Sequence, residues 1–261
     1  MQLGLIGAGN MARALARGWG EPVLCSDAGS GRATALVAEL GGEVVSNRQV
    51  AERADLVILC HKPAQLVQVA REISDVTRCV VSVLGATTTA RVQAAYPGTP
   101  VFVVIPNTPV EVRRGVIAYA ERPPAVAAND SVADPELEPQ VLSLFGRLGT
   151  VVRIPDRLVD AATSINGVGP AYLALVAEAQ IDAAVRHGVP ATLANELVLK
   201  TIAGAAALLD HRGFDTLAVR REVTSPGGST ARGLAALERG GLRAAFQDAM
   251  DASLTPSGGP R

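Results

Sequence analysis

The sequence predicts an α/β domain with a parallel sheet, followed by an all-α domain. Up to Pro155, short apolar runs alternate with longer helical stretches, which implies a parallel sheet covered by helices on both faces. Beyond that point, Ala- and Leu-rich helical sequence carries almost no strand signal. A glycine-rich turn directly after the first strand is the third indication. The composition, 48% hydrophobic and 19% charged, is ordinary for a globular protein.

Each element of the first domain follows from its apolar pattern. The short runs predict strands, and the longer stretches with apolar residues at helical spacing predict helices. The expected strands are Gln2–Ile6, Pro22–Ser26, Leu56–Cys60, Val80–Val83, Val101–Val104, Val116–Ala120 and Val151–Ile154. The expected helices are Met11–Trp19, Val50–Arg53, Ala64–Ile73 and Pro139–Leu148.

The second domain begins where this alternation stops, at Ile154–Asp156. We therefore expect one domain over residues 1–155 and a helical domain over 156–254. A tail over 255–261 is rich in Pro, Gly and Ser and is expected to be disordered. The expected helices of the second domain are Leu158–Ser164, Pro170–His187, Ala191–Asp210, Ser229–Arg239 and Leu242–Ala252, with a break at Asn166–Pro170.

The Ala-rich helices of this second domain predict a homodimer. The stretch Tyr172–Val185 is apolar nearly all round, and such a helix should be buried. A domain of about 100 residues cannot easily bury several such helices alone. The alternative is a monomer that folds these helices under the first domain.

Composition and charge exclude several classes of partner. Lys plus Arg number 24 and Asp plus Glu 25, so the basic excess typical of nucleic-acid binders is missing. No unbroken apolar run reaches membrane-spanning length, and no secretory leader precedes the first strand, so we expect a cytoplasmic protein without a membrane partner. Three cysteines, Cys25, Cys60 and Cys79, lie in apolar runs without a CxxC pair. Buried thiols are therefore expected, and no metal site.

The turn after the first strand has the pattern of a dinucleotide-binding site. Gly7-Ala8-Gly9-Asn10-Met11-Ala12 follows a strand and opens a helix, which is the G-x-G-x-x-G/A pattern of Rossmann-type domains. Gly7 permits the tight turn, Gly9 leaves space for the pyrophosphate, and Ala12 lets the helix pack on the sheet. The exposed N–H groups around Asn10 and Met11 then face the phosphates.

The end of the second strand leaves the choice of cofactor open. Asp27 lies close to the position of a ribose-binding acid, which favours NADH. Ser30 and Arg32 follow immediately and are suited to a 2′-phosphate, which favours NADPH. Arg32 is equally consistent with a solvated helix residue.

Five motifs together resemble the pyrroline-5-carboxylate reductases across nearly the whole chain. This resemblance implies reduction of 1-pyrroline-5-carboxylate to proline, the last step of proline biosynthesis, with NADPH or NADH as donor. It also implies a Rossmann domain, a C-terminal helical dimerisation domain, and dimers or rings of dimers. The motifs are Gly7–Met11, Lys62-Pro63, Pro106–Pro109, Gly167–Tyr172 and Val223–Thr230.

The last motif suits a substrate carboxylate. Ser225-Pro226-Gly227-Gly228-Ser229-Thr230 precedes a helix, and two glycines leave backbone N–H groups uncovered at its positive end. We therefore expect Ser225, Gly227, Gly228, Ser229 and Thr230 to bind substrate. By resemblance, the Thr230 hydroxyl holds the ring nitrogen while hydride reaches the neighbouring carbon. The simpler interpretation is a turn and a helix N-cap.

Two further loops are assigned to the cofactor by the same resemblance. Lys62-Pro63 follows the strand Leu56–Cys60 at the carboxyl edge, where ligands of open α/β sheets bind. Asn107 follows Val101–Val104 in the equivalent place and is expected near the nicotinamide. The histidines show no spacing with acids or a nucleophile and are expected to be structural or at the surface.

The chain departs from the family pattern at a few positions. Val103 stands where the family has an arginine, and Asn166 and Val168 replace two serines. These departures motivate two alternatives: a divergent paralogue that reduces another cyclic imine, and a non-catalytic, cofactor-binding dimer. A β-hydroxyacid dehydrogenase is a third, but its chemistry needs a catalytic lysine and Tyr172–Arg186 contains none.

Overall fold

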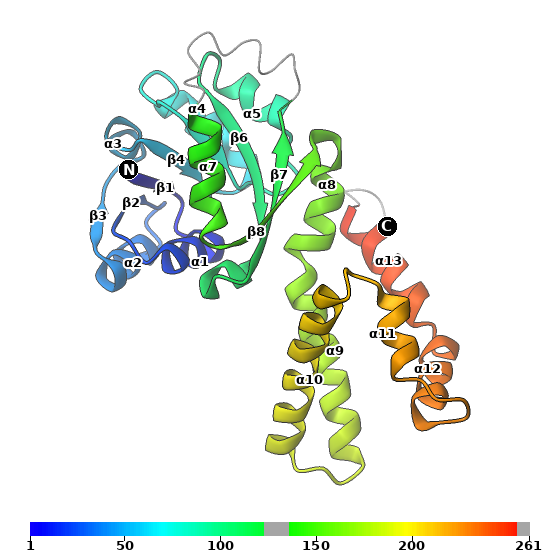
Figure 1. Cartoon of the computed structure of the whole chain (residues 1–261). Helices are drawn as coiled ribbons and strands as arrows, with labels where there is room; N and C mark the ends of the chain where they lie inside the picture. The colour runs from blue at the N-terminus through cyan, green and yellow to red at the C-terminus, as the bar shows by residue number, and fades with distance from the viewer. Residues whose placement is uncertain (123–135, 255–261) are drawn as a thin grey trace. The chain divides into compact units, whose positions relative to one another are not determined.

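The computed structural model describes residues 1–122 and 136–254, which form two compact units (Figure 1). By contacts, the units are Met1–Pro170 and Ala171–Arg261. The first is an α/β unit and the second is helical, so the predicted fold class is confirmed. The tail 255–261, which we expect to be disordered, lies outside the described residues.

The first unit is built on one eight-stranded sheet with the order β3-β2-β1-β4-β5-β6-β7-β8. All neighbours are parallel except β6 and β7. The order reverses at β1, whose Ile6 pairs with Ser26 on one side and Leu59 on the other, so the three strands end at one edge. The strands are β1 Leu3–Ile6, β2 Val23–Ser26, β3 Gly42–Val44, β4 Leu56–Leu59, β5 Val80–Ser82, β6 Val101–Pro106, β7 Gly115–Glu121 and β8 Gly149–Pro155.

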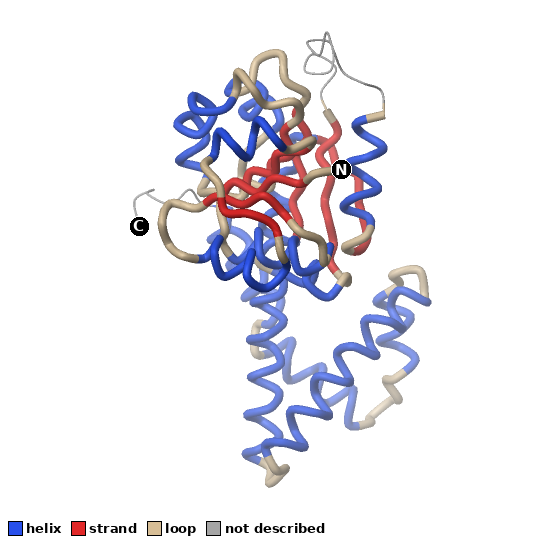
Figure 2. Tube along the Cα trace, turned by 90° about the vertical axis from the view of Figure 1, so that its left-hand side faces the viewer, coloured by secondary structure: helices blue, strands red, loops and turns tan. Residues whose placement is uncertain are grey.

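Helices cover both faces of this sheet (Figure 2). One face packs on α1 (Asn10–Trp19), α2 (Arg32–Leu40) and α7 (Leu137–Gly146). The other packs on α3 (Asn47–Arg53), α4 (Leu66–Ile73) and α5 (Thr89–Ala95). Because both faces are covered, every residue of β1, β2 and β4 is buried, as the unbroken apolar runs predict.

Trp19 fixes the helix whose N-terminus carries the glycine fingerprint. It ends α1, is 2% exposed, and donates its indole Nε1–H to the Leu144 carbonyl at 3.1 Å. Its ring meets Phe145 edge-on, with centroids 5.6 Å apart. Such aromatic pairs contribute about 0.5–1.5 kcal/mol beyond their buried area. The far end of α1 is therefore anchored to α7.

The structure contains elements that the sequence pattern missed. Every predicted strand is present, but β3, α2, α5 and α11 (Thr216–Glu222) were not expected. The strand β3 has only three residues, all exposed, so it lacks an apolar run. Its position is set by backbone pairing with β2 rather than by burial of side chains.

Residues 156–170 pack with the first unit, so the division by contacts comes later than the predicted boundary at Pro155. Val159 is fully buried in the core beneath the sheet. Asn166 donates its side-chain amide to the carbonyls of Ile105 and Val116, at 2.6 and 2.9 Å. The chain therefore leaves the α/β unit only after Pro170.

The predicted break at Asn166–Pro170 is narrower than expected. The preceding α-helix ends at Ala162, a π-helix covers Thr163–Gly167, and only the turn residue Val168 separates it from α9 (Gly169–Arg186). Pro170 is the second residue of α9, and proline is tolerated in a first turn because its missing N–H has no intrahelical partner there. Single-turn π-helical insertions within helices are frequent at functional sites.

The helical unit leaves much apolar surface uncovered in the single chain. In α9 and α10 (Ala191–His211) only Ala177 and Ala194 are buried, while Leu175 is 65% and Leu197 55% exposed. The unit continues through α11, α12 (Ser229–Arg239) and α13 (Leu242–Leu254). By length and composition alone, 156–186 and 191–211 are long and apolar enough to cross a membrane. Exposed faces of this kind mark surfaces that a partner or a membrane covers.

Candidate functional site

A cavity of about 320 Å³ opens at the carboxyl ends of β1, β2 and β4, where the strand order reverses. Ligands of open α/β sheets bind at such a switch point. The cavity brings together six of the predicted cofactor residues: Gly7, Gly9, Asp27, Ser30, Arg32 and Lys62. Its other lining residues are Ile6, Ala8, Ala28, Asn47, Cys60, His61, Gln65, Gln68, Val69 and Glu72. Asn10, Met11, Pro63 and Asn107 are not among them.

The two fingerprint glycines serve different physical purposes. Gly7 has φ +101°, and a Cβ there would lie 2.8 Å from Cys60 C and His61 N, so only glycine fits. Gly9 has φ −70° and ψ −174°, which any residue adopts, and a Cβ there would meet no atom within 4 Å. The turn needs Gly7 to fold, whereas Gly9 keeps open the space in front of α1.

The N-terminus of α1 is free to receive an anion. Gly9 is the N-cap, no side chain caps this end, and no acidic residue lies in the first turn. The Asn10 side chain turns along the helix, where its Oδ1 accepts from Arg13 Nη2 at 2.9 Å. The uncovered backbone N–H groups and the positive helix end therefore suit a pyrophosphate.

Asp27 is occupied by its own loop. Its Oδ1 accepts from Gly29 N at 2.8 Å, and its Oδ2 accepts from Ser30 Oγ at 2.9 Å and Ala33 N at 3.0 Å. These donors, led by Ala33 N–H, lower the pKa of Asp27. The carboxylate organises the turn into α2 instead of presenting free acceptors to a ribose. Arg32 lines the cavity with no side-chain hydrogen bond or ion pair in the described residues.

Lys62 and His61 cover the opposite wall, after β4. The Gln65 side chain accepts from Lys62 N at 3.2 Å, and His61 Nδ1 lies 2.9 Å from the Lys62 carbonyl. Burial lowers the pKa of His61, so the neutral ring donates from Nδ1. His61, which we expected to be structural or at the surface, is half-buried and lines the cavity. Cys60 also lines it, but burial raises its pKa and keeps the thiol protonated.

Asn107 holds two strands together. It is 9% exposed, and its Oδ1 accepts from Val116 N at 2.9 Å. Asn166 binds the carbonyl of the same Val116. Asn166, one of the departures from the family pattern, therefore clamps the ends of β6 and β7 through its longer amide side chain.

Sequence analysis missed Asn47 and Glu72, which both line the cavity. Ser26 Oγ donates to Asn47 Oδ1 at 2.6 Å, and Asn47 Nδ2 donates to Glu72 at 2.7 Å. The available signal was Ser46, whose side chain caps α3 and places Asn47 at the start of that helix. Because the short strand β3 was not predicted, the sequence could not place the start of α3 at the carboxyl edge of the sheet.

The second unit carries the other candidate site, at the N-terminus of α12. Gly227 has φ +69° and Gly228 is the N-cap, without a side-chain cap. Gly228 N donates to the Ser225 carbonyl at 3.0 Å, which closes the turn. Ser225 and Ser229 are exposed, and Arg232 turns back to the Gly227 carbonyl at 2.6 Å. An uncapped helix end with a neighbouring cation suits a carboxylate.

Thr230 is not the helix cap. It is the second residue of α12, half-buried, and its hydroxyl makes no hydrogen bond within residues 1–122 and 136–254. Ser225–Thr230 does form a turn and a helix N-cap, with Gly228 at the cap position, but the Thr230 hydroxyl takes no part in the cap. The Thr230 hydroxyl remains available to a ligand.

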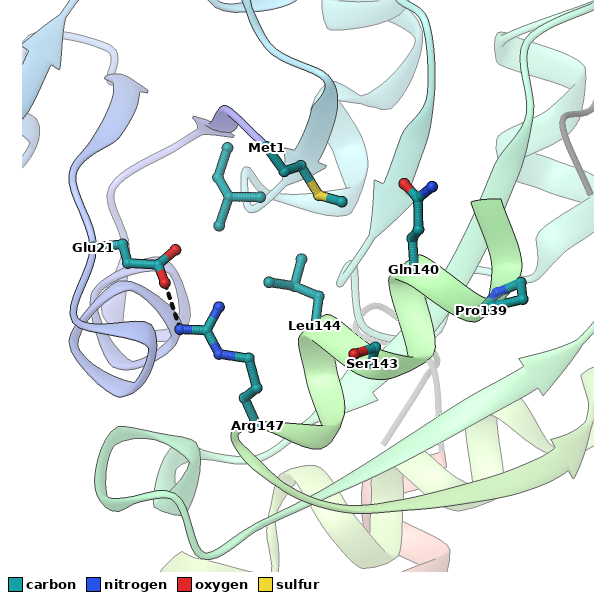
Figure 3. Close-up of a pocket in the computed structure, with 8 residues that line it drawn as sticks. Met1, Glu21, Pro139, Gln140, Ser143, Leu144 and Arg147 are labelled. Atoms are coloured by element: carbon teal, nitrogen blue, oxygen red, sulfur yellow. Dashed lines mark hydrogen bonds and ion pairs between the residues drawn. The ribbon is translucent and has the colours of Figure 1, made fainter. Parts of the chain in front are cut away.

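A larger cavity, of about 460 Å³, lies at the amino ends of β1 and β2 (Figure 3). Its charged groups satisfy each other: Arg147 pairs with Glu21 at 2.6 Å and donates to the Trp19 carbonyl at 3.3 Å. It lies at the opposite edge from the glycine fingerprint and holds none of the predicted site residues. Within the described residues, no cluster of three His, Cys, Asp or Glu side chains is placed to hold a metal ion.

Comparisons with known proteins cover nearly the whole chain. Residues 156–258 match the model of pyrroline-5-carboxylate reductase dimerisation, and residues 2–85 that of NADP oxidoreductase, coenzyme F420-dependent. A pyrroline-5-carboxylate reductase of Synechocystis is 33% identical, over 97% of this chain and 96% of its own. The enzyme of Streptococcus pyogenes superimposes with a TM-score of 0.86 at 26% identity, over 97% and 96% of the two chains. The reductase of Plasmodium falciparum with NADP bound gives 0.84 at 26%, over 97% and 95%.

Proposed function

Because this chain belongs to the pyrroline-5-carboxylate reductase family, we propose that it reduces 1-pyrroline-5-carboxylate to proline with NADPH or NADH. The observation that carries the proposal is the pairing of an intact glycine fingerprint with an intact Ser225–Thr230 loop. Full-length similarity to named reductases supports the same reaction. A β-hydroxyacid dehydrogenase and a non-catalytic cofactor-binding dimer are not favoured by any observation.

The first unit is suited to hold the cofactor. When bound, the reduced nicotinamide supplies a hydride. Gly7 and Gly9 shape the approach to the uncapped end of α1, where Asn10 and Met11 begin the helix. Lys62 lies on the facing wall at the end of β4, and Pro63 begins the helical turn that follows it. We place the nicotinamide end near Asn107, whose loop follows β6 at the same sheet edge.

We further propose that NADPH is preferred over NADH. The Asp27 carboxylate already accepts hydrogen bonds from Gly29, Ser30 and Ala33, so it has little capacity left to accept from a ribose diol. Arg32 lines the same end of the cavity with its guanidinium available. An unpaired guanidinium beside a serine is suited to a 2′-phosphate, which it binds with charge-assisted hydrogen bonds.

In the second unit, the loop before α12 is proposed to hold the substrate. The turn at Gly227 and Gly228 shapes this loop, with Gly228 N–H bonded to the Ser225 carbonyl, and we propose that the Ser229 N–H and the Ser225 hydroxyl bind the carboxylate. Thr230 is the proposed catalytic residue, because its hydroxyl has no partner in the described chain and lies in the first turn of the same helix. It would bind the ring nitrogen and orient the C=N carbon toward the hydride, which is catalysis mainly by positioning.

The helical segment 156–254 is proposed as the dimerisation and substrate domain of a cytoplasmic homodimer or ring of dimers. The apolar faces of α9 and α10 are exposed in one chain, and burial against a second copy removes them from water. The match of 156–258 to a dimerisation model supports this assembly over a membrane-spanning arrangement.

The test is oxidation of NADPH or NADH by the purified protein with 1-pyrroline-5-carboxylate, with proline measured as product. We expect turnover that depends on the imine and a proline yield equal to the dinucleotide consumed. Other cyclic imines should react more slowly. Absence of imine-dependent oxidation by folded protein that binds the dinucleotide would refute the proposal.

A further inference from the structure

The cofactor cavity contains an acidic side chain that the proposed reaction does not use. Glu72 lies at the end of α4 and lines the cavity beside Val69. A dinucleotide is itself an anion, so a carboxylate in its site is repulsive unless the ligand presents a donor to it. The part of the cofactor that lies next to Glu72 must therefore carry a hydrogen-bond donor.

The adenosine end is the part nearest to Glu72. The pyrophosphate belongs at the end of α1, and the Asp27–Arg32 loop bounds the cavity where the ribose would lie. Beyond the ribose, the remaining lining comes from α3 and α4, through Asn47, Val69 and Glu72. Val69 is 5% exposed and contributes only a small apolar area to this part of the lining, while the exposed Glu72 offers a polar group to the edge of a base.

Neighbouring groups hold the Glu72 carboxylate without neutralising it. One oxygen accepts from Asn47 Nδ2 at 2.7 Å, and Asn47 is fixed in turn by Ser26 Oγ at 2.6 Å. Arg48, next to Asn47, directs its guanidinium to Glu52 and Asp75, at 3.1 and 2.9 Å, and to the backbone carbonyl of Glu72 at 3.3 Å, but not to the Glu72 carboxylate. Within residues 1–122 and 136–254, the other Glu72 oxygen accepts no hydrogen bond. An oriented acceptor is left for the ligand.

We propose that Glu72 is a specificity-determining residue for the adenine base and accepts a hydrogen bond from its 6-amino group. This inference rests on the proposed function only in placing a dinucleotide in the cavity. Hypoxanthine carries a carbonyl oxygen in place of that amino group, so it would set an acceptor against the carboxylate. A site built this way rejects the deaminated cofactor.

The test compares NADPH with its hypoxanthine analogue, by titration without substrate and by kcat/KM with 1-pyrroline-5-carboxylate. We expect the wild type to favour NADPH by about 10- to 100-fold, the usual worth of a hydrogen bond to a charged group. Glu72→Gln keeps the shape and offers an amide that also donates to the hypoxanthine carbonyl. It should reduce the preference to within about threefold, chiefly by improving binding of the analogue.

Glu52→Gln is the matched control, because Glu52 pairs with the same Arg48 but does not line the cavity. It should keep the wild-type preference. An unchanged preference in folded Glu72→Gln overturns the proposal, and so does an equal loss for both cofactors, which would mean that Glu72 only positions Asn47. Because the titration needs no turnover, it tests the role of Glu72 even if the protein does not reduce the imine. Failure of the proposed reaction and failure of this inference are therefore distinguishable.

Discussion

Replacing Gly9 by valine should abolish cofactor binding and leave the fold intact. A Cβ at Gly9 meets no atom within 4 Å, and φ −70° with ψ −174° is open to any residue. The folded state should therefore lose only the small preference for glycine at an N-cap, about 1 kcal/mol. For a protein of this size, that lowers Tm by roughly 2–4 °C.

The binding loss should be much larger. The valine methyl groups would fill the space in front of the uncapped end of α1, where the pyrophosphate is proposed to bind. Two lost hydrogen bonds to a charged group are worth about 3–6 kcal/mol, so Kd should rise by at least about 100-fold. Fluorescence titration of NADPH gives the affinity, and thermal denaturation of the same sample gives Tm.

Gly7→Ala is the contrasting variant. At φ +101°, with Cys60 C and His61 N 2.8 Å from the new Cβ, alanine should strain the turn and push against β4. Strain and overpacking together cost about 2–5 kcal/mol, or roughly 5–15 °C in Tm. The reasoning is refuted if Gly9→Val binds NADPH within threefold of wild type, or if Gly7→Ala melts like wild type.

Three further outcomes are expected. Thr230→Ala should lower turnover by about 30- to 1,000-fold, the usual effect of one oriented contact worth about 2–4 kcal/mol. Its cofactor affinity and Tm should stay nearly unchanged, and Thr230→Ser should retain most activity. Normal turnover in Thr230→Ala would remove Thr230 from the mechanism. Arg32→Ala should reduce the ratio of kcat/KM for NADPH over NADH by about tenfold, and an untouched ratio would mean that Arg32 does not contact the 2′-phosphate. Light scattering at low micromolar concentration should report a dimer or a multiple of it, whereas a 26.8 kDa monomer would contradict the argument from the exposed α9 and α10 faces.

The sequence by itself determined the fold class and most of its strands. Apolar runs such as Leu56–Leu59 are fully buried between two helical layers, so their pattern is unbroken and visible without a structure. The glycine fingerprint and the Ser225–Thr230 loop were also visible, because each is a contiguous motif at the start of a helix. These residue types are required by the backbone geometry of a few neighbouring residues, so a short stretch of sequence is enough to predict them.

The tertiary structure alone decided how the polar groups are used. Asp27 matched a ribose-binding acid by spacing, yet its carboxylate is taken up by Gly29, Ser30 and Ala33. Asn47 and Glu72 lie 25 residues apart and meet only because α3 and α4 pack side by side on one face of the sheet. Hydrogen-bond partners of this kind depend on strand order and helix packing, which no periodicity in the chain encodes, and they decide which side chains remain free for a ligand.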